Sequence, residues 1–242
     1  MTQLETYSVW DPLVRWFHWI NVLCVLGLIA VGVAILNDKA LGVDNDGKIL
    51  LKSVHVYIGY VFAMNLALRL VWAFVGGKNA RWSAILPGGR GYWKELRSFV
   101  TALRAGRARP YLGHDPLARI ALTLLLVLLV VQAVSGLILA GTDLFLPPLG
   151  SRIASTVAAA GVDPATLVPY APAMYDAEAY AAMRSWRAPV ATAHLYLFYS
   201  LLVLASFHIV AVVVSEVRDG SGLVSAMFSG KKNLKQPPAD AP

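Results

Sequence analysis

The chain has 242 residues and a formal net charge of +7, with 57% hydrophobic and only 14% charged residues. A soluble domain carries roughly 25% charged residues, so this composition indicates a membrane protein. The positive charge does not call for a nucleic-acid partner, because in a membrane protein the distribution of lysine and arginine between loops matters more than their sum. The single cysteine, Cys24, excludes an intrachain disulfide, and the C-x-x-C-H motif of c-type haem attachment is absent from the sequence.

Four apolar segments are each long enough to cross a bilayer core of about 30 Å, which takes roughly 20 helical residues. They lie at about 16–36, 54–75, 117–141 and 189–215. The first is followed by Asn37-Asp38-Lys39 and not by a small-residue cleavage site, so we expect a membrane span there and no cleavable signal peptide. The sequence predicts an all-α membrane protein, a four-transmembrane-helix bundle that forms one domain over residues 1–242.

The distribution of charge between the connecting segments predicts the orientation. Segment 77–117 has eight basic and two acidic residues, segment 37–53 has three of each, and segment 142–188 has three basic and four acidic residues. The positive-inside rule therefore places 77–117 in the cytoplasm. Both termini then lie there too, including the tail 216–242, and 142–188 forms an extracytoplasmic loop.

Part of segment 77–117 is amphipathic. Apolar side chains recur near helical spacing, with basic residues between them: Trp93, Leu96, Phe99, Val100 and Leu103, and Lys94, Arg97 and Arg104. This pattern is typical of a helix that lies against membrane lipid at the inner interface, although a solvated surface helix has a similar pattern. A shorter segment of this kind, 223–228, follows the fourth span.

Four of the five histidines lie inside predicted spans: His18, His55, His194 and His208. An ionisable residue inside a membrane indicates function, although a single histidine can serve merely as an interhelical hydrogen-bonding residue. By depth along the spans, His55 and His194 form an outer pair, and His18 and His208 form an inner pair.

The spacing within the fourth span indicates what the pairs hold. His194 and His208 are 14 residues apart, which is about 3.9 helical turns and roughly 21 Å, so both point to nearly the same side. Two haems with two axial imidazoles each need this arrangement. Zinc, copper or a di-iron centre would need more ligands or carboxylates within reach.

Other residues recur at the same interval. Arg69 follows His55 by 14 residues, at the depth of the inner pair, so it is a candidate partner for an inner haem propionate or a snorkelling residue. Gly32, Gly59 and Gly136 lie near the outer pair, where they would leave room for a porphyrin or allow close helix contacts.

These residues resemble a known family. Residues 9–19, VWDPLVRWFHW, resemble the opening of the membrane cytochrome b subunits of nickel-iron hydrogenases, which are grouped with bacterial cytochrome b561. Segments 55–60 and 69–76 are similar to the second helix of this family. Segment 113–117 is similar to the start of the family's third helix, and His208 and segment 227–232 are similar to the family's C-terminal part. The resemblance covers most of the chain and is weakest in 142–188.

The resemblance implies a cytochrome of the bacterial inner membrane with two haem b groups, in which His18, His55, His194 and His208 are the ligands. It would transfer electrons between a periplasmic redox partner, a hydrogenase-type subunit or a c-type cytochrome, and the quinone pool. A quinone site is expected near the inner haem, where His114, Asp115 and Arg119 could relay protons, although His114 could also be an ordinary loop residue. No residue is assigned a catalytic role, and the chain is expected to act as an electron-transfer subunit.

Two other functions fit parts of the sequence. Small b561 proteins oxidise superoxide and reduce quinone without a partner, but such an enzyme would want a positive outer surface. The outer segments 37–53 and 142–188 together hold six basic and seven acidic residues. A non-redox transporter or membrane anchor could use its histidines for protons, but two pairs matched in depth argue against it.

Overall fold

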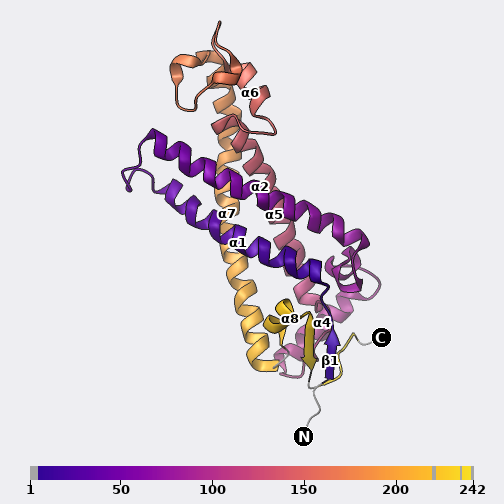
Figure 1. Ribbon diagram of the computed structural model, residues 1–242. Helices are drawn as coiled ribbons and strands as arrows, with labels where there is room; N and C mark the ends of the chain where they lie inside the picture. The colour runs from indigo at the N-terminus through magenta and orange to yellow at the C-terminus, as the bar shows by residue number, and fades with distance from the viewer. Residues whose placement is uncertain (1–4, 220–221, 235, 241–242) are drawn as a thin grey trace. The chain divides into compact units, whose positions relative to one another are not determined.

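The structure is a computed structural model that describes residues 5–219, 222–234 and 236–240 (Figure 1). Four helices in this part of the chain are long and apolar enough to cross a membrane: α1 (Pro12–Leu36), α2 (Asn45–Val75), α5 (Pro116–Leu144) and α7 (Ala177–Asp219). Between 0% and 22% of the residues in their apolar windows are buried inside the protein. Most of the apolar surface is therefore left for lipid, and the predicted helical membrane fold with four spans is confirmed.

Each of these four helices begins directly after an aspartate whose carboxylate accepts a hydrogen bond from the third helical N–H group. The backbone N–H of Val14 donates to Asp11 at 2.9 Å. The other three bonds are each 2.8 Å long and run from the N–H of Gly47 to Asp44, of Ala118 to Asp115 and of Ala179 to Asp176. An aspartate at this position satisfies an otherwise free N–H and complements the positive end of the helix dipole. Proline is the first residue of α1 and α5, where its missing N–H costs nothing.

The helices extend beyond the predicted spans. Helix α2 begins at Asn45 where a start near 54 was expected, and α7 begins at Ala177 where a start near 189 was expected. Residues 177–188 of the expected outer loop are thus the first turns of α7, which continues through Pro189. Hydropathy misses these turns because they are polar.

The described chain divides by its internal contacts into two compact units, and the long helices contribute to both. The first unit comprises Met1–Trp19, Leu66–Leu128 and Leu201–Pro242, and the second comprises Ile20–Asn65 and Leu129–Ser200. His18 and His208 belong to the first unit, whereas His55 and His194 belong to the second.

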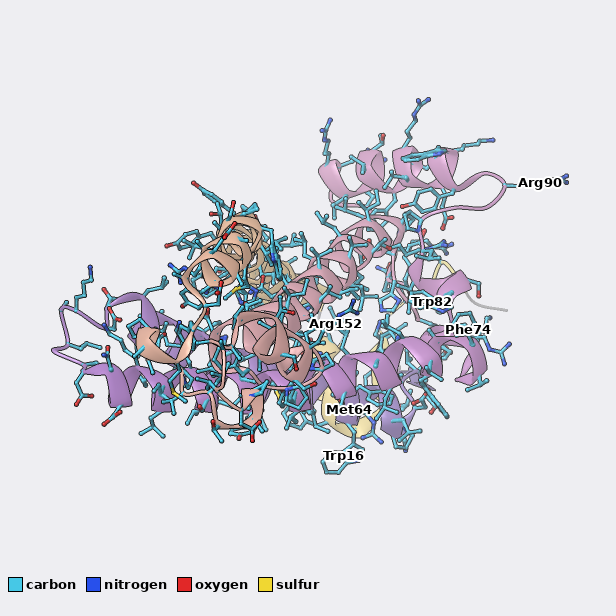
Figure 2. The ribbon with its side chains drawn as sticks, turned by 90° about the horizontal axis from the view of Figure 1, so that it is seen from above. Trp16, Met64, Phe74, Trp82, Arg90 and Arg152 are labelled. Atoms are coloured by element: carbon cyan, nitrogen blue, oxygen red, sulfur yellow. The ribbon has the colours of Figure 1, made fainter. Side chains whose placement is uncertain are left out.

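In the first unit, short elements surround the ends of the long helices. These are η1 (Lys78–Ala80), α3 (Trp82–Ile85), the expected amphipathic helix α4 (Tyr92–Arg104) and α8 (Leu223–Ser229). Trp16 projects away from α1 and is 67% exposed, and Arg90 projects from the loop before α4 (Figure 2). The ring of Trp82 lies 5.9 Å from that of Phe74, which joins α3 to the end of α2.

The two ends of the described chain pair with each other in the first unit. Strand β1 (Glu5–Ser8) runs antiparallel to β2 (Lys231–Leu234), with Glu5 opposite Leu234 (Figure 1). Within β2, Lys232 is 2% exposed, and its ammonium group donates to the carbonyls of Tyr111 at 3.1 Å and Leu112 at 2.8 Å. This contact fixes the segment that leads into α5.

In the second unit, residues 145–176 form an ordered outer segment. It contains α6 (Gly150–Val157), η2 (Pro164–Thr166) and η3 (Pro172–Met174). A β-bridge joins Ala158 to Tyr175, and the Tyr175 hydroxyl donates to the carbonyl of Val168. The segment that sequence reasoning treated as a loop therefore has its own internal hydrogen bonds.

Candidate functional site

His55 of α2 and His194 of α7 face each other in the second unit. Their ring centroids are 6.5 Å apart and the ring planes make an angle of 74°. Imidazoles on opposite sides of one metal ion, with metal–nitrogen bonds of about 2 Å, have ring centroids about 6 Å apart. The pair therefore has the separation that axial ligation of one metal ion requires.

Glycines make room for both imidazoles. A Cβ atom at Gly32 would lie 3.4 Å from Cε1 of His55, and one at Gly136 would lie 3.3 Å from Cε1 of His194. These two glycines thus accommodate the histidine rings. At Gly59, one turn after His55, a Cβ atom would meet nothing within 4 Å, so this face of α2 leaves space for a planar macrocycle.

A hydrogen-bond chain orients the His194 ring. Nδ1 of His194 lies 2.8 Å from Oγ of Ser135, and this hydroxyl donates to the carbonyl of Gln132 at 3.0 Å. Because the hydroxyl proton is used there, Nδ1 is the protonated nitrogen and Nε2 carries the free electron pair. This is the arrangement that a metal-binding histidine needs from its supporting residues.

Gln132 also contacts the nitrogen that would bind a metal. Its Nε2 lies 3.1 Å from Nε2 of His194, so ligation requires this amide to turn aside. Sequence reasoning missed Gln132 and Ser135, although a signal existed. They are polar residues three apart in an apolar span, and the second directly precedes Gly136.

His18 of α1 and His208 of α7 are brought together in the first unit, close enough for their charges to interact. The neighbouring Trp19 holds this end of α1 in place. Its Nε1 donates to the carbonyl of Met227 at 3.0 Å, and its ring lies 4.5 Å from that of Phe228. Helix α8 is thus packed against the turn that carries His18.

Arg69, the expected propionate partner, lies in the same unit as His18 and His208. Its Nη2 donates to the carbonyl of Ala80 at 3.2 Å, and its guanidinium interacts with the charge of Asp11. The guanidinium is thus anchored in the first unit, and its remaining N–H groups have capacity for a further acceptor.

His114 is buried beside the start of α5. Its ring lies 4.9 Å from that of Trp10 and donates to the backbone of Ala84, while Nδ1 has no partner in the described part of the chain. Burial, with the charges of Lys232, Arg69 and Arg119 nearby, lowers the pKa of His114 to about 4. Its imidazole is therefore neutral at physiological pH.

The two other expected relay residues have structural contacts. Burial raises the pKa of Asp115, while hydrogen bonds to the first turn of α5 act in the opposite direction. Arg119 donates from Nη2 to the carbonyl of Ser83 at 3.0 Å, and its guanidinium lies 5.1 Å from the centre of the Tyr92 ring. Asp115 therefore caps α5, and Arg119 joins α5 to α3 and to the start of α4.

A helical membrane protein whose spans present facing imidazoles belongs to a recognisable class, the membrane cytochromes of b type. The chain belongs to the prokaryotic cytochrome b561 family, whose sequence model matches residues 9–230. It is thus a multi-pass membrane protein of a cytochrome family.

Relatives support this assignment. The chain is 32% identical over 128 residues to the probable Ni/Fe-hydrogenase 1 B-type cytochrome subunit of Escherichia coli K12. The aligned region covers 48% of this chain and 53% of the E. coli protein. The chain thus spans about half the length of that relative. Two probable Ni/Fe-hydrogenase B-type cytochrome subunits are each 26% identical to this chain. The alignment with the Rhizobium leguminosarum protein covers 96% of this chain and 90% of that protein. The alignment with the Rhodobacter capsulatus protein covers 94% of this chain and 81% of that protein. No solved structure matches this one.

Proposed function

We propose that the chain binds two haem b groups and transfers electrons across the bacterial inner membrane. One haem lies between His55 and His194, and the other lies between His18 and His208. The observation that carries the proposal is the 6.5 Å separation of the His55 and His194 ring centroids, because it suits two axial ligands of one iron. Each bound haem supplies a reversible one-electron couple.

The surrounding residues prepare the ligands for that role. Ser135 holds Nδ1 of His194, so Nε2 would be the nitrogen that binds the iron. Gly32 and Gly136 allow both rings to approach, and Gly59 leaves space beside His55. The apolar faces of the spans exclude water, which keeps the cofactor in a low-dielectric environment.

The proposed orientation follows the positive-inside rule and puts both termini in the cytoplasm. The His55–His194 haem then lies on the periplasmic side, under residues 145–176, where it exchanges electrons with a hydrogenase-type subunit or a c-type cytochrome. The printed names of the relatives, which refer to Ni/Fe-hydrogenase, support a partner of this kind.

The quinone pool is the proposed partner of the His18–His208 haem. His114 is neutral, buried and unpartnered at Nδ1, while its ring N–H donates to the backbone of Ala84, so Nδ1 can accept a hydrogen bond from the hydroxyl group of a quinol. Asp115 is its neighbour in sequence, and burial raises the pKa of its carboxyl; it is the proposed proton carrier for this site.

The proposal is tested by optical spectra and haem content of the purified protein. The expected wild-type result is a reduced-minus-oxidised spectrum of haem b and two haems per chain. His55→Ala and His194→Ala should each lose one haem and keep the other, while His18→Ala and His208→Ala should lose the second haem. His114→Ala is the matched control and should keep both.

Two results would contradict this assignment. A single haem per wild-type chain would refute the two-site proposal. Equal loss of both haems from every ligand variant, with His114→Ala intact, would refute the pairing.

A further inference from the structure

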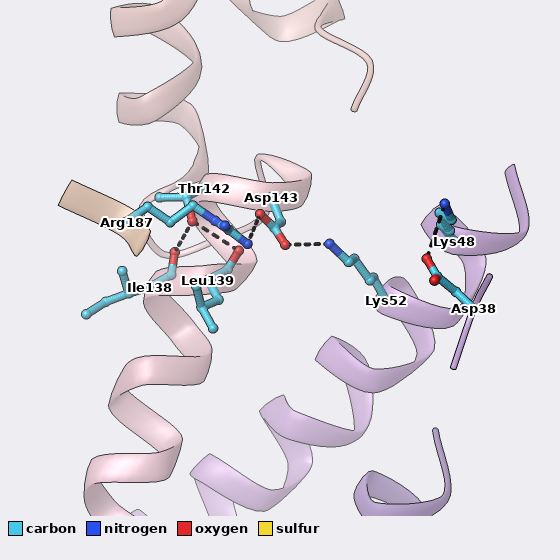
Figure 3. Close-up of polar contacts among 8 residues, drawn as sticks. All are labelled: Asp38, Lys48, Lys52, Ile138, Leu139, Thr142, Asp143 and Arg187. Carbon is cyan, nitrogen blue, oxygen red and sulfur yellow. Dashed lines mark hydrogen bonds and ion pairs between the residues drawn. The ribbon is translucent and has the colours of Figure 1, made fainter. Parts of the chain in front are cut away.

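Three charged side chains from three helices meet at one place in the second unit: Lys52 of α2, Asp143 of α5 and Arg187 of α7 (Figure 3). We call them the charged triad. The ammonium group of Lys52 lies 2.6 Å from one carboxylate oxygen of Asp143, and Nη2 of Arg187 contacts the other. The three side chains are 13–25% exposed, so water reaches them poorly.

The charged triad has one more positive than negative charge. In the described part of the chain, the ion pairs of Lys52 and Arg187 both go to Asp143. Nε of Arg187 is buried and has no hydrogen-bond partner there. Lys52 also faces Tyr170, whose ring centre lies 5.3 Å from the ammonium nitrogen. A surplus positive charge with a free N–H, held away from water, favours the binding of another anion.

The charged triad lies on the helix faces that carry the histidine pair. Lys52 precedes His55 by three residues, and Arg187 precedes His194 by seven. At 1.5 Å per residue these intervals are about 4.5 Å and about 10 Å along the helices, and both keep the side chains on the histidine face. Both cations are therefore displaced towards the same end of the histidine pair, Arg187 further along its helix than Lys52.

We propose that Lys52 and Arg187 bind the propionate carboxylates of the haem held by His55 and His194, and that Asp143 positions the two cations. This inference rests on the proposed function. The charges balance in the oxidised state, because a ferric porphyrin core and the charged triad each contribute one positive charge against two carboxylates. Reduction adds a negative charge beside the two cations, which makes the potential of this haem sensitive to each member of the charged triad.

The test is a redox titration of each haem in the purified holoprotein. Lys52→Gln and Arg187→Gln remove a positive charge, so each should lower the midpoint potential of the His55–His194 haem. The expected shift in midpoint potential is about 59 mV for this one-electron couple. It corresponds to a tenfold change in the ratio of reduced to oxidised haem at a fixed potential. Asp143→Asn removes a negative charge and should raise the same potential.

The matched control is Lys48→Gln. Lys48 lies one turn before Lys52 on α2 and forms its own ion pair, 3.2 Å from Asp38 (Figure 3). It undergoes the same change of charge without belonging to the charged triad. Both potentials should stay at the wild-type values in this variant, and the potential of the His18–His208 haem should stay constant throughout the series.

A purely structural ion cluster gives a different result. Potentials that do not move, or that move in the same direction in Lys52→Gln and Asp143→Asn, would overturn the proposal. If a variant fails to retain the haem, the wild-type apoprotein is loaded with haem whose carboxylates are methyl esters. Weaker binding of the ester than of haem at the His55–His194 site supports the proposal, and equal binding overturns it. Failure of the two-haem function itself is recognised separately, by the haem content of the wild-type protein.

Discussion

Replacement of His114 by phenylalanine should remove an acid-sensitive contribution to the stability of the first unit. The imidazole has a pKa of about 4 in the folded chain against an ordinary value of 6.5. Between these values the unfolded chain binds the extra proton, so stability falls as the pH is lowered through this window. The difference of about 2.5 pKa units corresponds to about 3 kcal/mol, of which about 2.5 kcal/mol is already lost at pH 4.5.

The measurement is the free energy of unfolding in detergent micelles, for the wild-type protein and His114→Phe, at several values between pH 7.5 and pH 4.5. All other titratable groups are common to both proteins, so their contributions cancel in the difference. The free energy of wild type relative to variant should fall by about 2.5 kcal/mol between these limits. Two parallel curves would show that His114 titrates normally, and the reasoning from its burial beside Trp10 would be wrong.

Three further variants test the haem sites. Gly136→Leu should lose the His55–His194 haem and keep the other, because a Cβ atom there already lies 3.3 Å from His194; a haem content unchanged from wild type would contradict this. Ser135→Ala removes the acceptor of Nδ1 of His194 and should weaken binding at that site about 10–100-fold, as measured by haem transfer to an apo-acceptor protein. Arg69→Ala should lower the midpoint potential of the His18–His208 haem, because a nearby positive charge favours the reduced form; an unchanged potential would rule out the contact of Arg69 with a propionate.

The positions of the spans could be predicted from the sequence because apolar windows of about 20 residues have few alternatives to a membrane helix. Their starts were predicted less well. Helix α2 has a polar first portion, and α7 has polar turns before Pro189, so hydropathy alone placed both starts too late. Asp44 and Asp176 carried the missing signal, since each caps its helix by accepting from a backbone N–H.

The histidine pairs could be predicted because depth and face follow directly from helix geometry. The residues around them were harder to identify. The contact of Ser135 with His194 depends on the rotation of α5 against α7, which the sequence does not specify. In the sequence Lys52 and Arg187 are two of the basic residues counted in segments 37–53 and 142–188, and only the fold brings both to the single carboxylate of Asp143.

The β1–β2 pair has a consequence for the order of assembly in the cell. The Thr6 hydroxyl donates to the Asn233 side chain across 227 residues of sequence, so β1 finds its partner only after the four spans between the two strands have been synthesised. Closing so long a loop is a late event, because chain entropy opposes it until the intervening helices are in place. Removal of β2 would also withdraw Lys232 from the carbonyls of Tyr111 and Leu112. A chain interrupted before residue 231 would therefore contain the four spans but lack the strand that fixes the segment leading into α5.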